Sequence, residues 1–269
     1  MIMKLLLALF SFVLICGSYA APAAPAKAPA QKKAAAPKRA AGRRNVVKTY
    51  YDAKFVKGSW NPADWEMVRS WRFDHDAAFL QMPNCIQNRV PEGLTDDELQ
   101  GKKGNEGYAI MLLKQKFKGN TVITCNMEFD YRMAPGIILA YEPVKHGKDK
   151  LELREHFEVI LFDDGLNLWH HYFEKAAPNA KDPRVIRTGV EQKWRKQCHL
   201  TEKKFYKPKT KYEVKVDVRY TSRGPQIEIS CGGRVIGCYA PQMPQGEYRI
   251  GIVGCEGRNR FYDFKVTNR

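Results

Sequence analysis

Hydrophobic positions recur with a period of two along most of this chain. In residues 123–133, every second position is hydrophobic or cysteine, and the positions between them are polar or charged. Residues 211–220 repeat the pattern, with tyrosine and valine alternating with charged residues. Successive side chains of a strand point to opposite faces, so strict alternation predicts strands with one buried face.

Further short strands are expected throughout the second half of the chain. Residues 225–240 predict a hairpin around Gly232 and Gly233, and residues 248–254 and 260–266 predict two closing strands. Only residues 95–102 predict a helical turn, with Thr95 as its cap and Glu98 as the reciprocal partner. Ten or more short strands with so little helix predict an all-β fold, an antiparallel β-sandwich or jelly roll.

The first 44 residues differ in pattern from the rest. In residues 1–20, Lys4 precedes an apolar run that ends in small residues, which predicts a signal peptide cleaved after Ala20 and an exported, secreted or periplasmic protein. The apolar run is too short for a transmembrane span. Residues 21–44 are rich in Ala, Pro, Lys and Arg and contain no acidic or aromatic residue, which predicts a disordered linker. The folded domain is therefore expected over residues 45–269.

Charge narrows the choice of partners. The chain has a formal net charge of +16, and residues 45–269 keep +8, with 37 Lys and Arg against 29 Asp and Glu. A basic excess favours anionic partners, which for an exported protein are acidic glycans or cell-envelope polymers. A basic helix and an aromatic RNA-binding signature are both missing from the sequence, so nucleic acid is not expected as a partner. Six cysteines follow the signal peptide, and we expect at least one disulfide, with a pair among Cys231, Cys238 and Cys255 favoured.

Residues 154–173 gather chemically active side chains in one predicted hairpin. Asp164-Gly165 is a typical two-residue turn, and this register places Glu158 opposite His171. One face of the hairpin is then hydrophobic, with His170 among its residues. The other face carries the candidate site: Arg154, His156, Glu158, Ile160, Asn167, Trp169 and His171.

Four interpretations of this face remain open. A saccharide could stack on Trp169 and bond to Arg154 and Asn167, because sugars need an aromatic plane and directed polar groups. Glu158 could act as an acid or base with His171 or His156 as its partner. His156, Glu158 and His171 could hold a metal, although we predict neither a metal nor a cofactor. The fourth interpretation is an ordinary solvated sheet face. The remaining tryptophans, Trp194 among them, are expected in the core.

The order of motifs also resembles a known family. The early "DWEMVRSWRFDHDAAFLQM", the central "HFEVILFDDG" and the ending from "YEVKVDVRY" through "PQGEYRIGIVG" to "FYDFKV" resemble the concanavalin A-like (laminin G-like) jelly roll. Among its members they are most similar to the bacterial 3-keto-disaccharide hydrolase family and related glycosyl hydrolases. The resemblance implies a carbohydrate-directed protein, and only Glu158 sits at a position that matches the family. Three functions follow as hypotheses: a glycan hydrolase, a non-catalytic glycan-binding module and a structural envelope protein.

Overall fold

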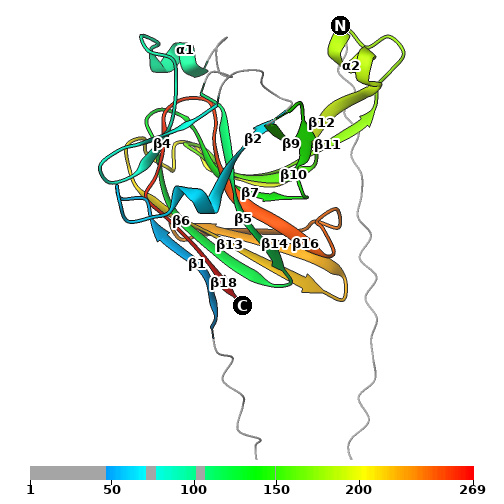
Figure 1. Cartoon of the computed structure of the whole chain (residues 1–269). Coiled ribbons are helices and arrows are strands. Elements are labelled where there is room, and N and C mark those ends of the chain that lie inside the picture. Colours follow the sequence, from blue (N-terminus) through cyan, green and yellow to red (C-terminus); the bar gives the residue numbers. More distant parts are fainter. Residues whose placement is uncertain (1–46, 71–76, 101–106, 149) are drawn as a thin grey trace, which may run out of the picture. The chain divides into compact units, whose positions relative to one another are not determined.

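The alternating segments form two sheets of nine strands each, whose inner faces enclose a hydrophobic core (Figure 1). The computed structural model describes residues 47–70, 77–100, 107–148 and 150–269. The predicted signal peptide and linker lie outside the described residues and stay predictions. Residues 45–269 form one compact unit.

The first sheet has the order β15-β14-β13-β6-β17-β4-β3, and β18 pairs with both β6 and β1. All its pairs are antiparallel. Its strands are β1 (Thr49–Lys54), β3 (Phe79–Gln81), β4 (Ile86–Asn88), β6 (Thr121–Phe129), β13 (Tyr212–Thr221), β14 (Gly224–Cys231), β15 (Arg234–Tyr239), β17 (Asn259–Phe261) and β18 (Asp263–Asn268).

The second sheet has the order β12-β11-β10-β7-β16-β5-β2-β9-β8. Its pairs are antiparallel except for the parallel contact between β2 and β9. Its strands are β2 (Trp65–Ser70), β5 (Ala109–Lys118), β7 (Met133–Ala140), β8 (Val144–His146), β9 (Lys150–Leu153), β10 (His156–Phe162), β11 (Gly165–Lys175), β12 (Val190–Thr201) and β16 (Glu247–Gly254). Strand β16 lies between β7 and β5 although more than 100 residues separate it from them in the sequence, so distant segments build the sheet together.

Helix is confined to short pieces in the described part of the chain: η1 (Pro62–Asp64), α1 (Asp96–Gln100) and α2 (Pro183–Thr188). All three are far shorter than the roughly 20 residues that a helix needs to cross a bilayer. The predicted cap of α1 is confirmed, since Glu98 N donates to Thr95 Oγ1 at 3.3 Å and Thr95 N donates to Glu98 Oε2 at 2.9 Å.

Helix α2, which the hydrophobic pattern did not predict, lies in the connection from β11 to β12 (Figure 1). Its signals are nevertheless in the sequence. Asp182 caps the first turn, Pro183 begins the helix, and Gly189 ends it in the left-handed region with φ of 67°.

The core between the sheets is formed by the hydrophobic positions that recur with a period of two. Ile123, Cys125, Met127 and Phe129 of β6 are fully buried, while the residues between them are partly exposed. Strand β6 ends at Phe129, so Tyr131 and Met133 are not part of this strand as the pattern had suggested. The hairpin at Gly232 and Gly233 is confirmed, with positive φ at both glycines. The predicted all-β sandwich of the jelly-roll kind is thus confirmed.

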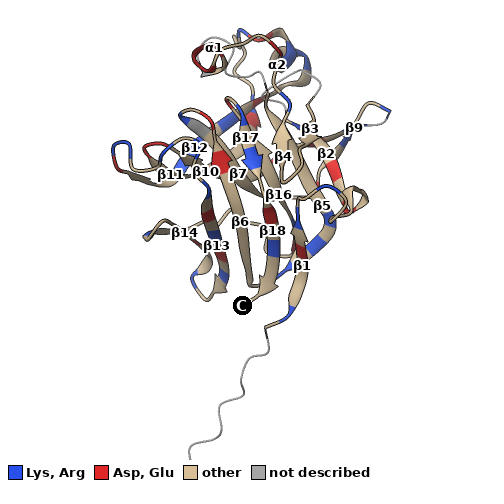
Figure 2. Cartoon of the chain, turned by 90° about the vertical axis from the view of Figure 1, so that its left-hand side faces the viewer, with Lys and Arg blue, Asp and Glu red and all other residues tan. Residues whose placement is uncertain are grey.

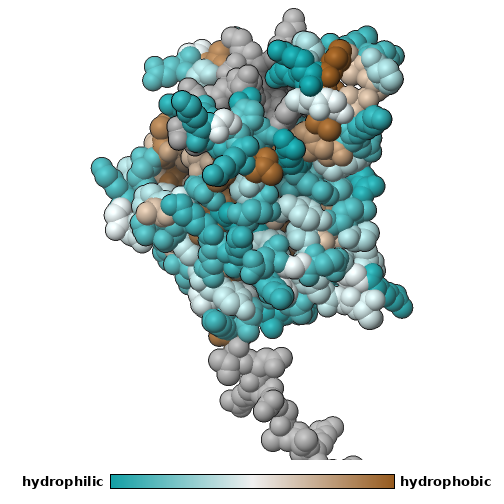
Figure 3. Space-filling view, turned by 45° about the vertical axis from the view of Figure 1, so that its right-hand side comes forward, coloured by the Kyte–Doolittle hydropathy of each residue, from teal (hydrophilic) through white to brown (hydrophobic). Residues whose placement is uncertain are grey.

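Acidic and basic residues both occur along strands of the first sheet such as β13 and β18 (Figure 2). Asp217 is buried there because Arg219 and Arg269 both donate hydrogen bonds to its carboxylate. On the face shown in Figure 3, hydrophilic residues dominate and hydrophobic residues form small, separate patches. Exposed apolar patches of this small size are usual for folded domains.

The outer face of the second sheet is different, because a second hydrophobic cluster covers it. The cluster consists of Val68, Tyr108, Ile110, Leu112, Ala134, Ile138, Ala140, Leu153, Ile160, Val253 and Cys255. This sheet is therefore buried on both faces over much of its area. Polar groups on its outer face are correspondingly removed from solvent, which sets the environment of the site described below.

The cysteines do not follow the expected pairing. All six described cysteines are free thiols. Cys238 of β15 contacts Cys198 of β12 through a hydrogen bond between their side chains, and Cys255 Sγ donates to Ala134 O at 3.1 Å. The expectation of a pair among Cys231, Cys238 and Cys255 is therefore wrong. The thiol beside Cys238 belongs to the edge strand of the opposite sheet.

Candidate functional site

The β10–β11 hairpin turns one residue earlier than predicted. Phe162 pairs with Gly165, so Asp163 and Asp164 form the turn. Gly165 is required for a different reason: a Cβ at this position would lie 1.8 Å from Leu200 O of the neighbouring strand β12. The glycine thus permits close approach of β12 instead of supplying the second turn residue.

The earlier turn shifts the pairing by two residues without changing the faces. His156 pairs with His171, and Glu158 pairs with Trp169, so the predicted direct pair of Glu158 with His171 is wrong. Because side chains alternate with a period of two, a shift of two keeps each of them on its predicted face. The predicted grouping of His156, Glu158, Trp169 and His171 is therefore what the structure shows.

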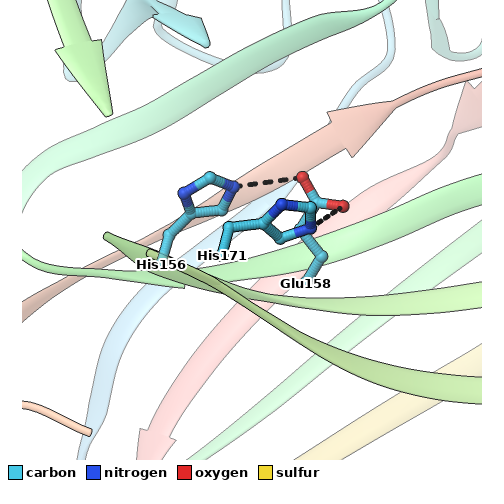
Figure 4. Close-up of side chains that lie close together, drawn as sticks. All are labelled: His156, Glu158 and His171. Atoms are coloured by element: carbon cyan, nitrogen blue, oxygen red, sulfur yellow. Dashed lines mark hydrogen bonds and ion pairs between the residues drawn. The ribbon is translucent and has the colours of Figure 1, made fainter. Parts of the chain in front are cut away.

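The centre of this face is a buried carboxylate between two imidazoles (Figure 4). His156 Nε2 lies 3.1 Å from Glu158 Oε1, and His171 Nε2 lies 3.1 Å from Glu158 Oε2. The exposed fractions of His156, Glu158 and His171 are 0%, 1% and 2%. The two imidazole rings stack with centroids 4.7 Å apart and planes 4° apart. We call these three residues the His–Glu–His cluster.

Tyr108 is a fourth member of the site that sequence analysis missed. It lies immediately before β5, and its hydroxyl donates a short hydrogen bond to Glu158 Oε1. Tyr108 is 50 residues away from Glu158 in the sequence, and the successive pairing of β5 with β16, of β16 with β7 and of β7 with β10 brings them together. The hydroxyl fixes the orientation of the carboxylate.

The surroundings set the protonation states of the cluster. Burial raises the pKa of the Glu158 carboxyl, but His171 and His156 outweigh this effect and hold its pKa well below its usual value. Burial lowers the pKa of His156 to about 4, although the hydrogen bond to Glu158 acts in the opposite direction. At neutral pH the site therefore contains an ionised carboxylate beside a neutral imidazole.

A pocket of about 220 Å³ opens in front of the cluster. The predicted site residues Glu158, Asn167, Trp169 and His171 all line it. Phe162, Ile160, Ala134 and Cys255 add an apolar part of the lining. His156 does not line the pocket and supports Glu158 from beside it.

Two further pocket residues, Trp194 and Glu256, come from elsewhere in the chain. Trp194 of β12 pairs with His171 and is 55% exposed, so the expectation that it lies in the core is wrong. Glu256 follows β16 in a loop and has a positive φ of 49°. Neither residue carries a local sequence signal for this role.

The structure does not bring Arg154 to the pocket. Its Nε lies 3.8 Å from Glu152 Oε1, and its guanidinium lies 6.0 Å from the centre of the Phe173 ring. His170 faces the core side, stacks on Phe157 and lies with its Nε2 3.0 Å from Glu155 Oε1. His170 is therefore a structural histidine, as its position on the hydrophobic face predicted.

The arrangement offers three kinds of chemistry. The two tryptophans provide flat apolar surfaces beside polar groups, which suits a sugar ring. The pocket carboxylates Glu158 and Glu256 provide groups for proton transfer. His156, Glu158 and His171 each offer one donor atom, and these atoms all lie within 4.8 Å of one another, close enough to share a metal ion.

Comparisons with known proteins give structural similarity alone. A scan against models of protein families finds no match, and a search of curated proteins also finds none. Among solved structures, lectin II from Ulex europaeus has 8% identity and a TM-score of 0.47, with 84% of this chain and 99% of that chain covered. A carbohydrate-binding module from Bacillus subtilis has 11% identity and a TM-score of 0.44, covering 74% and 92%. An endo-β-1,4-glucuronan lyase from Trichoderma reesei has 10% identity and a TM-score of 0.42, covering 82% and 96%.

Identities and TM-scores this low transfer no ligand and no site residue to this chain. The resemblance to the 3-keto-disaccharide hydrolase family stays a prediction. The pocket in front of the His–Glu–His cluster is therefore the basis for the proposed function.

Proposed function

We propose that this chain is an exported protein that binds one sugar residue of a glycan in this pocket and hydrolyses its glycosidic bond. The observation that carries the proposal is the combination of two tryptophans with a buried, ionised carboxylate in one small pocket. Sugar rings present an apolar face and a rim of hydroxyls, and sites for them combine aromatic planes with a few directed polar groups. The volume of about 220 Å³ is below the range of about 300–1,000 Å³ for drug-sized ligands, which suits a single ring.

Asn167 supplies a polar group suited to a ligand. It is 7% exposed and lines the pocket, and its Oδ1 accepts no hydrogen bond within the described residues. A buried polar atom without a partner is unfavourable. A sugar hydroxyl that donates to Asn167 Oδ1 would satisfy it, and Trp169 on the same strand would stack against the ring.

Two carboxylates favour hydrolysis over simple binding. Glycoside hydrolysis commonly uses a pair of Asp or Glu residues that flank the scissile bond. Glu158 and Glu256 line one pocket, and Glu158 is held in its ionised form. We assign Glu158 to the activation of the attacking water and Glu256 to protonation of the leaving oxygen, with His156 and His171 positioning Glu158.

The net charge of the domain favours an anionic saccharide. Residues 45–269 have a net charge of +8, and Lys196 Nζ lies 5.0 Å from the centre of the Trp169 ring. A cation beside the stacking platform would attract a uronate or sulfate group on a neighbouring sugar. Acidic glycans of the cell envelope are therefore the proposed ligands.

A glycan array followed by product analysis tests this proposal. The full chain is screened against neutral and acidic oligosaccharides, and ligands that bind are incubated with it and analysed by mass spectrometry. We expect binding, and release of a shorter product. Glu256→Gln should retain binding and lose product formation, and Trp169→Ala should lose binding.

The control is Trp60→Ala, because Trp60 lies in a different pocket and should leave binding unchanged. Binding that Trp169→Ala does not alter would reject the pocket as the saccharide site. Binding without any product would leave a non-catalytic glycan-binding module in place of a hydrolase.

A further inference from the structure

We propose that His156, Glu158 and His171 bind one divalent transition-metal ion, with zinc as the ion that the donor set fits best. This differs from the expectation of no metal drawn from the sequence. The site is composed of two imidazole nitrogens and one carboxylate oxygen, which is the ligand set of known catalytic zinc centres.

The distances within the cluster fit one shared ion. Zinc binds histidine nitrogen at about 2.0–2.1 Å and carboxylate oxygen at about 2.0–2.2 Å, so two ligands in a tetrahedral site lie about 3.3 Å apart. The two imidazole-to-carboxylate distances are both 3.1 Å. All three donor atoms lie within 4.8 Å of one another. In a tetrahedral site this separation would be about 3.3 Å, so movements of up to about 1.5 Å would complete the site.

The donor atom of His171 makes an ion-pair contact with Glu158 but no hydrogen bond of good geometry within the described residues. His171 Nε2 is close to Glu158 Oε2, yet neither ring nitrogen of His171 makes a hydrogen bond within the described residues. His171 is 2% exposed, so solvent does not replace the missing partner. This is an observation independent of the donor types.

The Glu158 carboxylate is also oriented by a hydrogen bond from a neighbouring group, as metal ligands usually are. Tyr108 donates a hydrogen bond to Glu158 Oε1 and fixes the orientation of the carboxylate. Groups that hydrogen-bond to a ligand from behind orient it and strengthen metal binding. Removing the Tyr108 hydroxyl should weaken metal affinity by about 10–100-fold, as changes of such supporting groups typically do.

The pocket would leave part of the coordination sphere open. Glu158 and His171 line the cavity of about 220 Å³, so a bound ion would face it. Three protein ligands with one open position are typical of catalytic zinc, which lowers the pKa of a bound water. With an ion bound, Glu158 would be a metal ligand, and the ion in place of the free carboxylate would supply the activation of water. That use rests on the proposed function, whereas the metal site itself does not.

Metal content and metal-induced stabilisation test the inference on the full chain. The protein is stripped with a chelator, dialysed against Zn²⁺, Co²⁺ or Mn²⁺, and analysed by inductively coupled plasma mass spectrometry and thermal unfolding. We expect about one Zn²⁺ per chain. At a hundredfold excess over Kd, we expect Tm to rise by about 5–10 °C. The Co²⁺ form should show visible absorption bands typical of nitrogen and oxygen ligands at an open site.

Variants locate the ion. Glu158→Gln keeps the size of the side chain and an acceptor for Tyr108, and His171→Asn removes one imidazole; both should abolish the bound metal and the Tm shift. The matched control is His199→Asn, because His199 is an exposed histidine of β12 outside the cluster and should leave both unchanged. Circular dichroism of the metal-free variants checks that they fold. If they unfold, X-ray absorption of the Zn²⁺ form of the unaltered protein shows whether two imidazoles bind the ion.

The outcomes separate this inference from the proposed function. Less than about 0.1 ion per chain and no Tm shift with any of the three ions would overturn the metal site, and saccharide binding could still be present. Metal that survives Glu158→Gln and His171→Asn would also overturn it, because the ion would be elsewhere. One ion per chain without saccharide binding would support the metal site and reject the saccharide.

Discussion

Leu168 and Trp169 are neighbours on β11 whose side chains point to opposite faces of the second sheet, and their replacement by alanine should have opposite effects. Leu168 is fully buried in the core between the sheets. Trp169 is partly exposed, lines the pocket and packs only at the margin of the outer cluster. Leu168→Ala should therefore damage stability, and Trp169→Ala should damage ligand binding.

The magnitude for Leu168 follows from its burial. Replacing leucine by alanine removes three carbon atoms from a site with 0% exposure, which costs about 2.4 kcal/mol of transfer free energy at about 0.8 kcal/mol each. The cavity that remains adds to this, so the total should be about 3–4 kcal/mol, within the usual range of about 2–5 kcal/mol. For a domain of this size the loss corresponds to a fall in Tm of about 6–16 °C.

Trp169→Ala should cost less than Leu168→Ala, because part of the indole is already in solvent and its contact with Lys196 at 5.0 Å contributes only about 0.5–1 kcal/mol. Urea denaturation gives the free energy of unfolding of each variant, and titration with a saccharide gives its affinity per folded molecule. Leu168→Ala should keep the affinity, and Trp169→Ala should lose it. If Trp169→Ala destabilises the domain as much as Leu168→Ala does, Trp169 is a core residue and the pocket has been misassigned.

Four further predictions concern the rest of the chain. Arg249 is 3% exposed and donates hydrogen bonds to Glu66, Glu142 and Leu113 O. Arg249→Ala should lower the free energy of unfolding by about 3 kcal/mol, and Glu142→Ala by less than about 1 kcal/mol. Equal losses in urea denaturation would refute this. Diamide treatment should oxidise Cys198 and Cys238 to a disulfide, which mass spectrometry would detect as a linked peptide pair. Iodoacetamide at pH 8 should leave Cys125 unmodified, because burial raises the pKa of its thiol. Affinity for an acidic saccharide should fall between 0.05 and 0.5 M NaCl, since added salt screens exposed charges, and an affinity that does not change would count against an anionic ligand. N-terminal sequencing of the exported protein should begin at Ala21, and any other start would contradict the predicted cleavage site.

The sequence alone determined the features that depend on neighbours along the chain. The period of two assigned each side chain of β6, β10, β11 and β13 to a face, because alternation is a property of a single strand. Thr95 and Glu98 predicted the cap of α1 for the same reason, since both partners lie within one turn. The grouping of His156, Glu158, Trp169 and His171 followed from this local rule. It survived an incorrect turn because the error displaced the pairing by two residues.

Only the tertiary structure decided which segments meet. Gly165 is a glycine because Leu200 of β12 lies against it, and no pattern within the hairpin shows this contact. The sequence therefore suggested Gly165 as a turn residue, and the predicted turn lay one residue too late. Tyr108, Trp194 and Glu256 reach the site from the position before β5, from β12 and from the loop after β16. The contact between the thiols of Cys198 and Cys238 joins the edges of the two sheets. Such contacts depend on the order of strands in the sheets. That order is set by the packing of the whole core, and the alternation within any one strand is compatible with many orders.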